Sequence, residues 1–278
     1  MGATYRQQII NFFNTTASTS QTVTVGALGT ISVAGNAYVG IVKTSSGYIL
    51  NSVTDSVGNT WYVDFSPSTS GSAKVWSISA YVSNPLANTN TITFNFSAAT
   101  NLGAIIMEFS GISSGYSGYA SSGQRTTQFF GAYESLSTAA ATTNTITYPS
   151  SGYLGAIGAG DLIWSGQVIS GTGTGITWST SPVNTGSLSG FPWLGLLPGN
   201  GTVASSATTN ALIGVYGGAI TAPYIPPTFK YTWSPSQANN DGFIGFYAGS
   251  WNNYSYSISS SAFIKPTYYS TLSMMGIG

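Results

Sequence analysis

The sequence contains no cysteine and no histidine, and only six basic and six acidic residues occur among its 278 residues. Without cysteine there can be no disulfide, thiolate metal ligand or thiol nucleophile. Without histidine the commonest general base and metal ligand is missing. Charged residues make up 4% of the chain, against about 25% in an ordinary soluble domain. We therefore expect no cofactor and no metal, and no nucleic-acid partner, because so few cations cannot neutralise a run of phosphates.

Long apolar runs are also missing. The best one, residues 103–109, contains Glu108 and is far shorter than the roughly 18 residues that a membrane helix needs. We therefore expect no membrane insertion. The first residues show no basic segment followed by an apolar one, as a secretory signal would. The sequence thus suggests either a mature protein whose signal was removed, or one that leaves the cell without a signal, as a virion protein does.

Small hydroxylated residues, glycine and aromatic residues are abundant: the chain has 43 Ser, 35 Thr, 35 Gly, 7 Trp, 18 Tyr and 13 Phe. Disordered chains are poor in aromatics, so this chain can bury a sizeable core. Its zero net charge favours self-association over colloidal repulsion. A surface of hydroxyls and amides hardly changes charge with pH. These features indicate an extracellular protein, in a hot or acidic setting.

Strand patterns recur about every ten residues, whereas helix-forming residues are scarce and glycine or serine interrupts every window of helical length. Residues 91–96 and 74–81 alternate polar and apolar side chains, as half-buried strands do. This rhythm predicts an all-β fold, an antiparallel, jelly-roll-like β-sandwich. The predicted strands are 7–13, 21–25, 36–43, 48–54, 59–65, 74–82, 90–96, 103–109, 126–135, 144–148, 153–159, 211–217, 228–233, 242–248 and 254–264.

The domain prediction is a single β-sandwich over residues 1–250, with a loop insertion at about 168–202, and a C-terminal tail over 251–278. The tail is rich in aromatics, so we expect it to dock on its own domain or on a neighbouring subunit. Long insertions at the edge of β scaffolds often carry contacts. The insertion either packs as a flap on its own sandwich or forms a subunit interface through Phe191, Trp193, Leu194, Leu196 and Leu197.

Four short motifs follow one another: VTDSVGNTW (53–61), VWSI (75–78), NTITF (90–94) and IIMEFSG (105–111). Their order resembles a β-sandwich module of bacterial, archaeal and phage surface proteins, over roughly residues 7–250. The resemblance implies a jelly-roll-like sandwich on the outside of a cell or virus, and it implies no catalytic residues. The composition is more loosely similar to filament and virion proteins of hyperthermophilic archaea and their viruses.

The carboxylates suggest structure rather than catalysis. Asp55 and Asp64 lie on either side of a predicted hairpin, and Asp55 suits a turn former whose side chain bonds the backbone two residues on. Glu108 lies in an apolar strand in which residues 106 and 108 share one face. When buried, it needs a partner such as Lys74, Arg125 or a cluster of hydroxyls. No histidine is present to activate a serine. We therefore predict a protein that is not an enzyme.

The function hypothesis is a structural subunit that self-assembles into an extracellular filament or a virion component, with itself as partner. Donor-strand exchange would join the copies, and the predicted assembly strand holds Gln8, Ile9, Ile10, Phe12 and Phe13. In the resembling module this segment would be the domain's own first strand. The alternative is a receptor- or carbohydrate-binding adhesion module that recognises a cell-surface glycan. In a glycosylating host, the sequons at Asn14 and Asn200 are the favoured acceptors, because both are expected in loops.

Overall fold

The structure is a computed structural model. It describes residues 4–26, 30–45, 48–65, 73–112, 118–119, 125–126, 130–137, 141–147, 162–169, 174–181, 193–196, 211–217, 228–237 and 240–247. All regular elements in these ranges are β-strands, and every pair of neighbouring strands is antiparallel. The fold is therefore all-β, as the sequence predicted. The jelly-roll order of strands stays a prediction.

The strands divide into an N-terminal and a C-terminal set. The N-terminal set is β1 (Thr4–Thr24), β2 (Ala37–Ser45), β3 (Leu50–Asp55), β4 (Trp61–Phe65), β5 (Ala73–Tyr81) and β6 (Thr91–Ser110). The later strands are β7 (Gly118–Tyr119), β8 (Arg125–Thr126), β9 (Phe130–Ser137), β10 (Ala141–Thr147), β11 (Leu162–Ile169), β12 (Thr174–Ser181), β13 (Trp193–Leu196), β14 (Ala211–Gly217), β15 (Thr228–Gln237) and β16 (Asn240–Tyr247).

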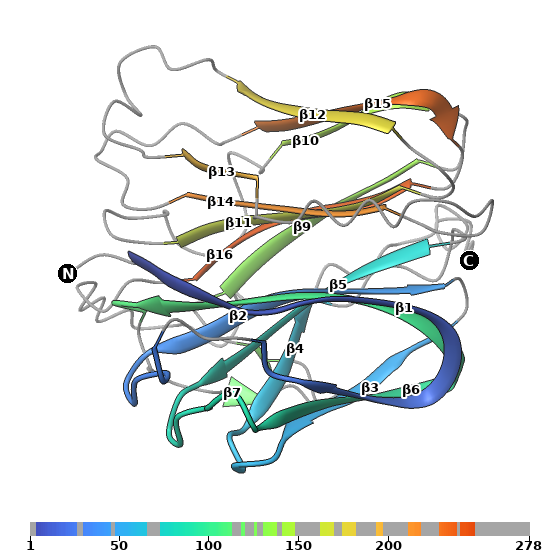
Figure 1. The fold of residues 1–278 in the computed structure, drawn as a ribbon. Helices are drawn as coiled ribbons and strands as arrows, with labels where there is room; N and C mark the ends of the chain where they lie inside the picture. Colours follow the sequence, from blue (N-terminus) through green and yellow to red (C-terminus); the bar gives the residue numbers. More distant parts are fainter. Residues whose placement is uncertain are drawn as a thin grey trace, which may run out of the picture.

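The N-terminal sheet is built around two long strands, β1 and β6, which bend together (Figure 1). The start of β1 pairs with the end of β6, from Thr4–Ser110 to Asn14–Leu102, and β2 pairs on the other side of that half of β6. The end of β1 pairs with the start of β6, which β3 also joins. The pairing register shifts near Ser18, within a run of small residues, and such bulges bend strands. One sheet therefore supplies two facing layers.

The hydrophobic core lies between these layers. It contains Ile9, Ile10, Val23 and Val25 of the β1 segment, Leu50 and Val53 of β3, Trp76, Ile78 and Ala80 of β5, and Ile92, Phe94 and Phe96 of β6, among others. Along the first half of β6 burial alternates, because one face meets this core and the other meets solvent. The alternation of polar and apolar residues at 91–96 therefore reflects burial of one face of the strand, as expected.

The second half of β6 is buried on both faces. Ile106 belongs to the core cluster, whereas Ile105 and Met107 point to the opposite face and are also fully buried. On β2, Val39 and Ile41 lie beside them on that opposite face. Strands β11 and β16 of the C-terminal half contact β5, which belongs to the same sheet as β2 and β6. A continuous apolar run such as 103–109 is what a strand covered on both faces requires.

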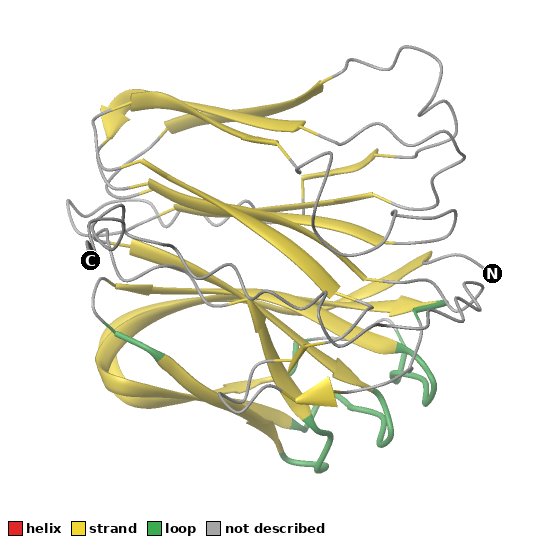
Figure 2. Ribbon diagram, turned by 180° about the vertical axis from the view of Figure 1, so that it is seen from behind, coloured by secondary structure: helices red, strands yellow, loops and turns green. Residues whose placement is uncertain are grey.

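The C-terminal half adds a five-stranded sheet in the order β13-β14-β11-β16-β9 and a three-stranded sheet in the order β10-β15-β12. Figure 1 and the reverse view in Figure 2 show these sheets stacked in layers beyond the N-terminal sheet. Strands β12 and β13 both fall within 168–202, so the structure corrects the expectation of a plain loop insertion there. The predicted strands 153–159 and 254–264 lie outside the described residues.

The predicted hairpin around residues 56–60 is wrong. Strand β3 pairs with β6 and strand β4 pairs with β5, so the turn between them crosses from one layer to the other. Asp55 and Asp64 therefore stand in different layers of the N-terminal half, on strands that share no ladder. The described part of the chain contains no helix long and apolar enough to cross a bilayer.

Candidate functional site

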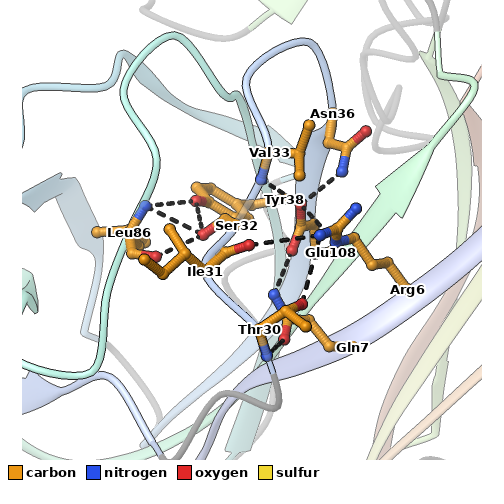
Figure 3. A network of polar contacts seen from close by, with 10 residues as sticks. All are labelled: Arg6, Gln7, Thr30, Ile31, Ser32, Val33, Asn36, Tyr38, Leu86 and Glu108. Carbon is orange, nitrogen blue, oxygen red and sulfur yellow. Dashed lines mark hydrogen bonds and ion pairs between the residues drawn. The ribbon is translucent and has the colours of Figure 1, made fainter.

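Glu108, on β6, is a fully buried carboxylate at one end of the N-terminal core; its side chain is 0% exposed. Its Oε2 accepts a hydrogen bond of 2.6 Å from Nε2 of Gln7. Its Oε1 accepts a bond of 2.9 Å from the backbone N–H of Val33 and another from Nδ2 of Asn36, and it lies 3.5 Å from Nε of Arg6. Figure 3 shows these donors converging on the carboxylate. A buried charge is tolerated only when it is paired in this way.

A bulge in β1 explains how two consecutive residues of that strand reach one carboxylate. Tyr5 pairs with Phe109 and Gln7 with Glu108, with a register shift between the two pairs, so Arg6 and Gln7 together oppose Glu108. In an extended strand, consecutive side chains point to opposite faces, and a bulge alters that alternation locally. The bulge in β1 thus allows both Arg6 and Gln7 to reach the carboxylate of Glu108.

The same residues hold the loop formed by residues 30–36. The guanidinium of Arg6 donates to Oγ1 of Thr30 at 3.3 Å and to the carbonyl of Ile31 at 3.4 Å. The N–H of Thr30 donates to Oε1 of Gln7 at 3.4 Å. Glu108 therefore connects three segments: the first strand, the 30–36 loop and β6. Lys74, one of the partners expected from the sequence, instead lies opposite Thr44 at the far end of β2. The side chain of Arg125, the other expected partner, lies outside the described part of the structure.

A second polar group lies next to the carboxylate. The hydroxyl of Tyr38 donates to Oγ of Ser32 at 2.7 Å and accepts from the N–H of Leu86 at 3.2 Å, while Ser32 also bonds both backbone groups of Leu86. Burial raises the pKa of Tyr38 to about 12, chiefly by removing water from the hydroxyl. Tyr38 therefore stays protonated and keeps donating across the whole neutral range.

Asp55 closes the turn between β3 and β4, as the sequence predicted. Its Oδ1 accepts the backbone N–H groups of Val57, Gly58 and Asn59 at 3.1, 2.7 and 3.0 Å. Its Oδ2 accepts from Nδ2 of Asn59 at 2.9 Å and from Nε1 of Trp61 at 2.8 Å. One carboxylate therefore satisfies five donors.

Asn59 connects this turn to the next loop through hydrogen bonds. Its Oδ1 accepts the N–H groups of Ser83 and Asn84 at 3.0 and 2.8 Å, and its Nδ2 donates to the carbonyl of Asn84 at 2.8 Å. The ring of Trp61 stacks on Tyr38 with centroids 5.6 Å apart. The loops 30–36, 56–60 and 82–90, which we call the loop end, are thus connected to one another by hydrogen bonds and ring stacking. Figure 2 draws the described loops in green.

The chemistry open to this site is limited by access. Glu108 has no exposed surface, and Asp55 already accepts five hydrogen bonds. Within the described ranges, no three acidic side chains gather where they could hold a metal ion. The geometry is that of a clamp that fixes β1 and the loops.

A second candidate site is the outer edge of strand β1. It is 21 residues long, pairs with β6 on one side, and among the described strands has no partner on the other. Ile9 and Ile10 are 1% and 2% exposed and Phe12 packs on the core. The predicted assembly strand is thus paired within its own chain: Gln8, Ile10, Phe12 and Phe13 oppose Met107, Ile106, Ala104 and Gly103. A role in assembly stays a prediction.

The other predicted site residues are only partly placed. Asn14 lies in β1 rather than in a loop, and its Nδ2 donates to Oε1 of Gln21 at 2.9 Å. This corrects the premise of the glycosylation prediction, because the acceptor nitrogen is engaged in the fold. Trp193, Leu194 and Leu196 belong to β13, which pairs with β14. Phe191, Leu197 and Asn200 lie outside the described residues.

Lys43 is a buried cation that the sequence analysis did not single out. It is 3% exposed, and it lies opposite Val75 and Gly103 on the face of the sheet that the C-terminal half covers. Burial lowers the pKa of Lys43 to about 8, because the charged form loses its hydration.

Arg6, Gln7 and Asn36 were also missed. The one signal for them was Glu108 itself, since a carboxylate in an apolar run must find donors elsewhere. Comparison of the chain with protein-family models, with curated proteins and with solved structures finds no match.

Proposed function

We propose that the chain is a non-enzymatic structural subunit that self-assembles outside the cell, into a filament or a virion component, through strand β1. The observation that carries this proposal is the outer edge of β1, along which none of the described strands pairs with it. An edge strand presents a row of unpaired N–H and C=O groups, which readily pair with another chain.

The composition of β1 strengthens the argument. Soluble proteins protect their edges with charged side chains, prolines or short strands. Strand β1 spans 21 residues, contains no proline and has a single charged residue, Arg6, which is engaged with Glu108. Two geometries are open to it. A neighbouring copy can add a strand to the outer edge, or β1 itself can leave its place beside β6 and occupy the same place in a neighbour.

Asp55 and Glu108 both accept hydrogen bonds that hold the fold together, and this supports the non-enzymatic part of the proposal. The low content of charged residues and the zero net charge of the chain support self-association and an extracellular setting. The alternative, a receptor- or carbohydrate-binding adhesion module, calls for exposed aromatic side chains. Among the side chains that the structure describes, the large exposed hydrophobic ones are Ile31, Val33 and Ile49, none of them aromatic. The structural role therefore remains our first choice.

Electron microscopy and light scattering of the purified chain, at neutral and acidic pH, test the proposal. We expect ordered filaments or shells. A double variant with charges on β1, Ala17→Lys with Thr24→Lys, should prevent assembly, because both positions are exposed and like charges repel across a strand pair. The matched control, Ser83→Lys with Thr89→Lys, puts the same charge on exposed loop positions and should assemble normally.

Uniform single particles at every concentration and pH would refute self-assembly, and binding of such particles in a glycan screen would favour the adhesion module. Assembly by the β1 variant with failure of the control would move the contact away from β1.

A further inference from the structure

The place that β1 occupies beside β6 contains two kinds of contact. Ile9 and Ile10 fill apolar sites and are almost completely buried. Any strand with apolar side chains at these positions could fill such sites, because hydrophobic contacts are not directional. Glu108, by contrast, demands particular donors at one position.

If β1 left this place, Glu108 would lose the contacts that this strand supplies. Its Oε2 has Gln7 as its hydrogen-bond donor, and Arg6 is the cation beside Oε1. Val33 and Asn36 would remain, since both belong to the 30–36 loop. A fully buried carboxylate without its cation is strongly unfavourable. An incoming strand without equivalent donors would leave Glu108 in this unfavourable state.

We infer that Glu108 selects the strand that can lie beside β6: the place accepts a strand with the arginine–glutamine pair of β1, so the partner it fits is β1 of a second copy of this chain. This inference deepens the proposed function and rests on it. A swapped β1 from a second copy restores every contact of Glu108 shown in Figure 3. An unrelated strand leaves the buried carboxylate without its cation and without the donor on Oε2, and unpaired charges of this kind are how interfaces reject wrong partners.

The same contact fixes the register of the incoming strand. A slip of two residues keeps each side chain on its own face, so apolar packing alone discriminates weakly against it. Such a slip would, however, place Tyr5 or Ile9 opposite Glu108 in place of Gln7. The side chain of Ile9 has no donor, and Tyr5 has one hydroxyl donor but no charge, so neither replaces both the hydrogen bond from Gln7 and the cation of Arg6. Glu108 therefore specifies both the identity and the alignment of the strand.

The test uses the full chain and fluorescent synthetic peptides of residues 4–24, mixed in dilute urea, in which β1 can exchange. Incorporation is measured by fluorescence anisotropy and native mass spectrometry. We expect the native peptide to be incorporated, and a peptide with Arg6→Gln and Gln7→Leu to bind on the order of thirtyfold more weakly, because a buried charge loses its partners. A control peptide with Ala17→Ser, at an exposed position, should match the native peptide.

The reciprocal change is Glu108→Gln in the full chain. This chain has no buried charge to satisfy, so it should accept both peptides to within about threefold. Should that variant fail to fold, the three peptides on the native chain still decide the question. Equal incorporation of native and altered peptides, equal discrimination by the Glu108→Gln chain, or no incorporation of the native peptide would each overturn the inference. Peptide selectivity is measured without polymerisation, so a chain that never polymerises fails the proposed function separately.

Discussion

The indole nitrogen of Trp61 donates a hydrogen bond of 2.8 Å to Oδ2 of Asp55, across the turn that joins the two layers of the N-terminal half. The same indole ring stacks on Tyr38, whose hydroxyl is bonded to Ser32. The turn is therefore anchored both to its own carboxylate and to the network around the 30–36 loop. Disturbing Asp55 should loosen the whole loop end.

Replacing Asp55 with alanine should lower the free energy of unfolding by about 3 kcal/mol, because five donors lose a charged acceptor, which is worth more than a neutral one. Asp55→Asn should cost less, since one amide oxygen can still accept from the backbone. Urea denaturation measures both changes. Thr60→Ala, an exposed substitution in the same turn, is the control and should change little. An Asp55→Ala chain as stable as the control would show that the turn is held by other contacts.

Two glycines of the N-terminal half should respond very differently to alanine. At Gly40, in β2, an added Cβ would lie 2.8 Å from Cγ1 of Ile106 and 2.9 Å from the carbonyl oxygen of Ile105. That carbonyl belongs to a central strand and cannot move away, so we expect Gly40→Ala to cost about 3 kcal/mol.

Gly58 has a φ of 82° and open space around its α-carbon. Gly58→Ala should therefore cost only about 1 kcal/mol, the penalty of the left-handed conformation itself. Each variant is the control of the other in urea denaturation. A larger loss for Gly58→Ala than for Gly40→Ala would contradict the close packing of β2 against β6.

Lys43 should make stability depend on pH. Its pKa is about 8 in the folded chain, against 10.5 for an ordinary lysine, so the unfolded chain binds more protons between these two values. Stability therefore rises with pH across this window. Lys43→Met removes the penalty of about 3 kcal/mol, from 1.36 kcal/mol per pKa unit. The variant should be more stable than the native chain below pH 8, with a difference that fades towards pH 10.5.

Thermal denaturation from pH 6 to pH 11 measures this difference, with Thr60→Ala as the control whose effect should not vary with pH. A difference between Lys43→Met and the native chain that stays constant to pH 11 would show that Lys43 reaches water in the folded state.

The sequence alone does not indicate which residues far apart in the chain contact one another. Glu108 was recognised as a buried carboxylate in need of donors, but Gln7 and Asn36 are 101 and 72 residues away from it in the chain. Which polar residue meets Glu108 depends on the register of β1 against β6 and on the path of the 30–36 loop. The amide and hydroxyl residues that could serve are so numerous in this chain that their type gives no guidance.

Strand continuity was hidden for a related reason. Residues 7–13 and 21–25 were predicted as two strands, and so were 90–96 and 103–109, yet each pair belongs to one long strand. Between them lie runs of Ser, Thr, Ala and Asn, which are typical of turns because their side chains can bond to the nearby backbone. In the run 15–20 of β1, only Ser18 and Ser20 have ladder partners on β6, and local bonds such as those from the N–H of Thr16 to Oδ1 of Asn14 and from Oγ of Ser18 to the carbonyl of Ser20 are made. The strand nevertheless continues through this bend with its pairing register shifted.

The sequence by itself determined the local features: an all-β chain, one-sided burial where apolar residues alternate, two-sided burial at 103–109, and a turn closed by Asp55. These follow from side-chain period and from hydrogen bonds between residues close in the chain. Only the tertiary structure decided that β1 and β6 bend together to enclose a core, and that Arg6 and Gln7 meet Glu108. Those outcomes depend on pairings between segments a hundred residues apart, which local preference cannot select.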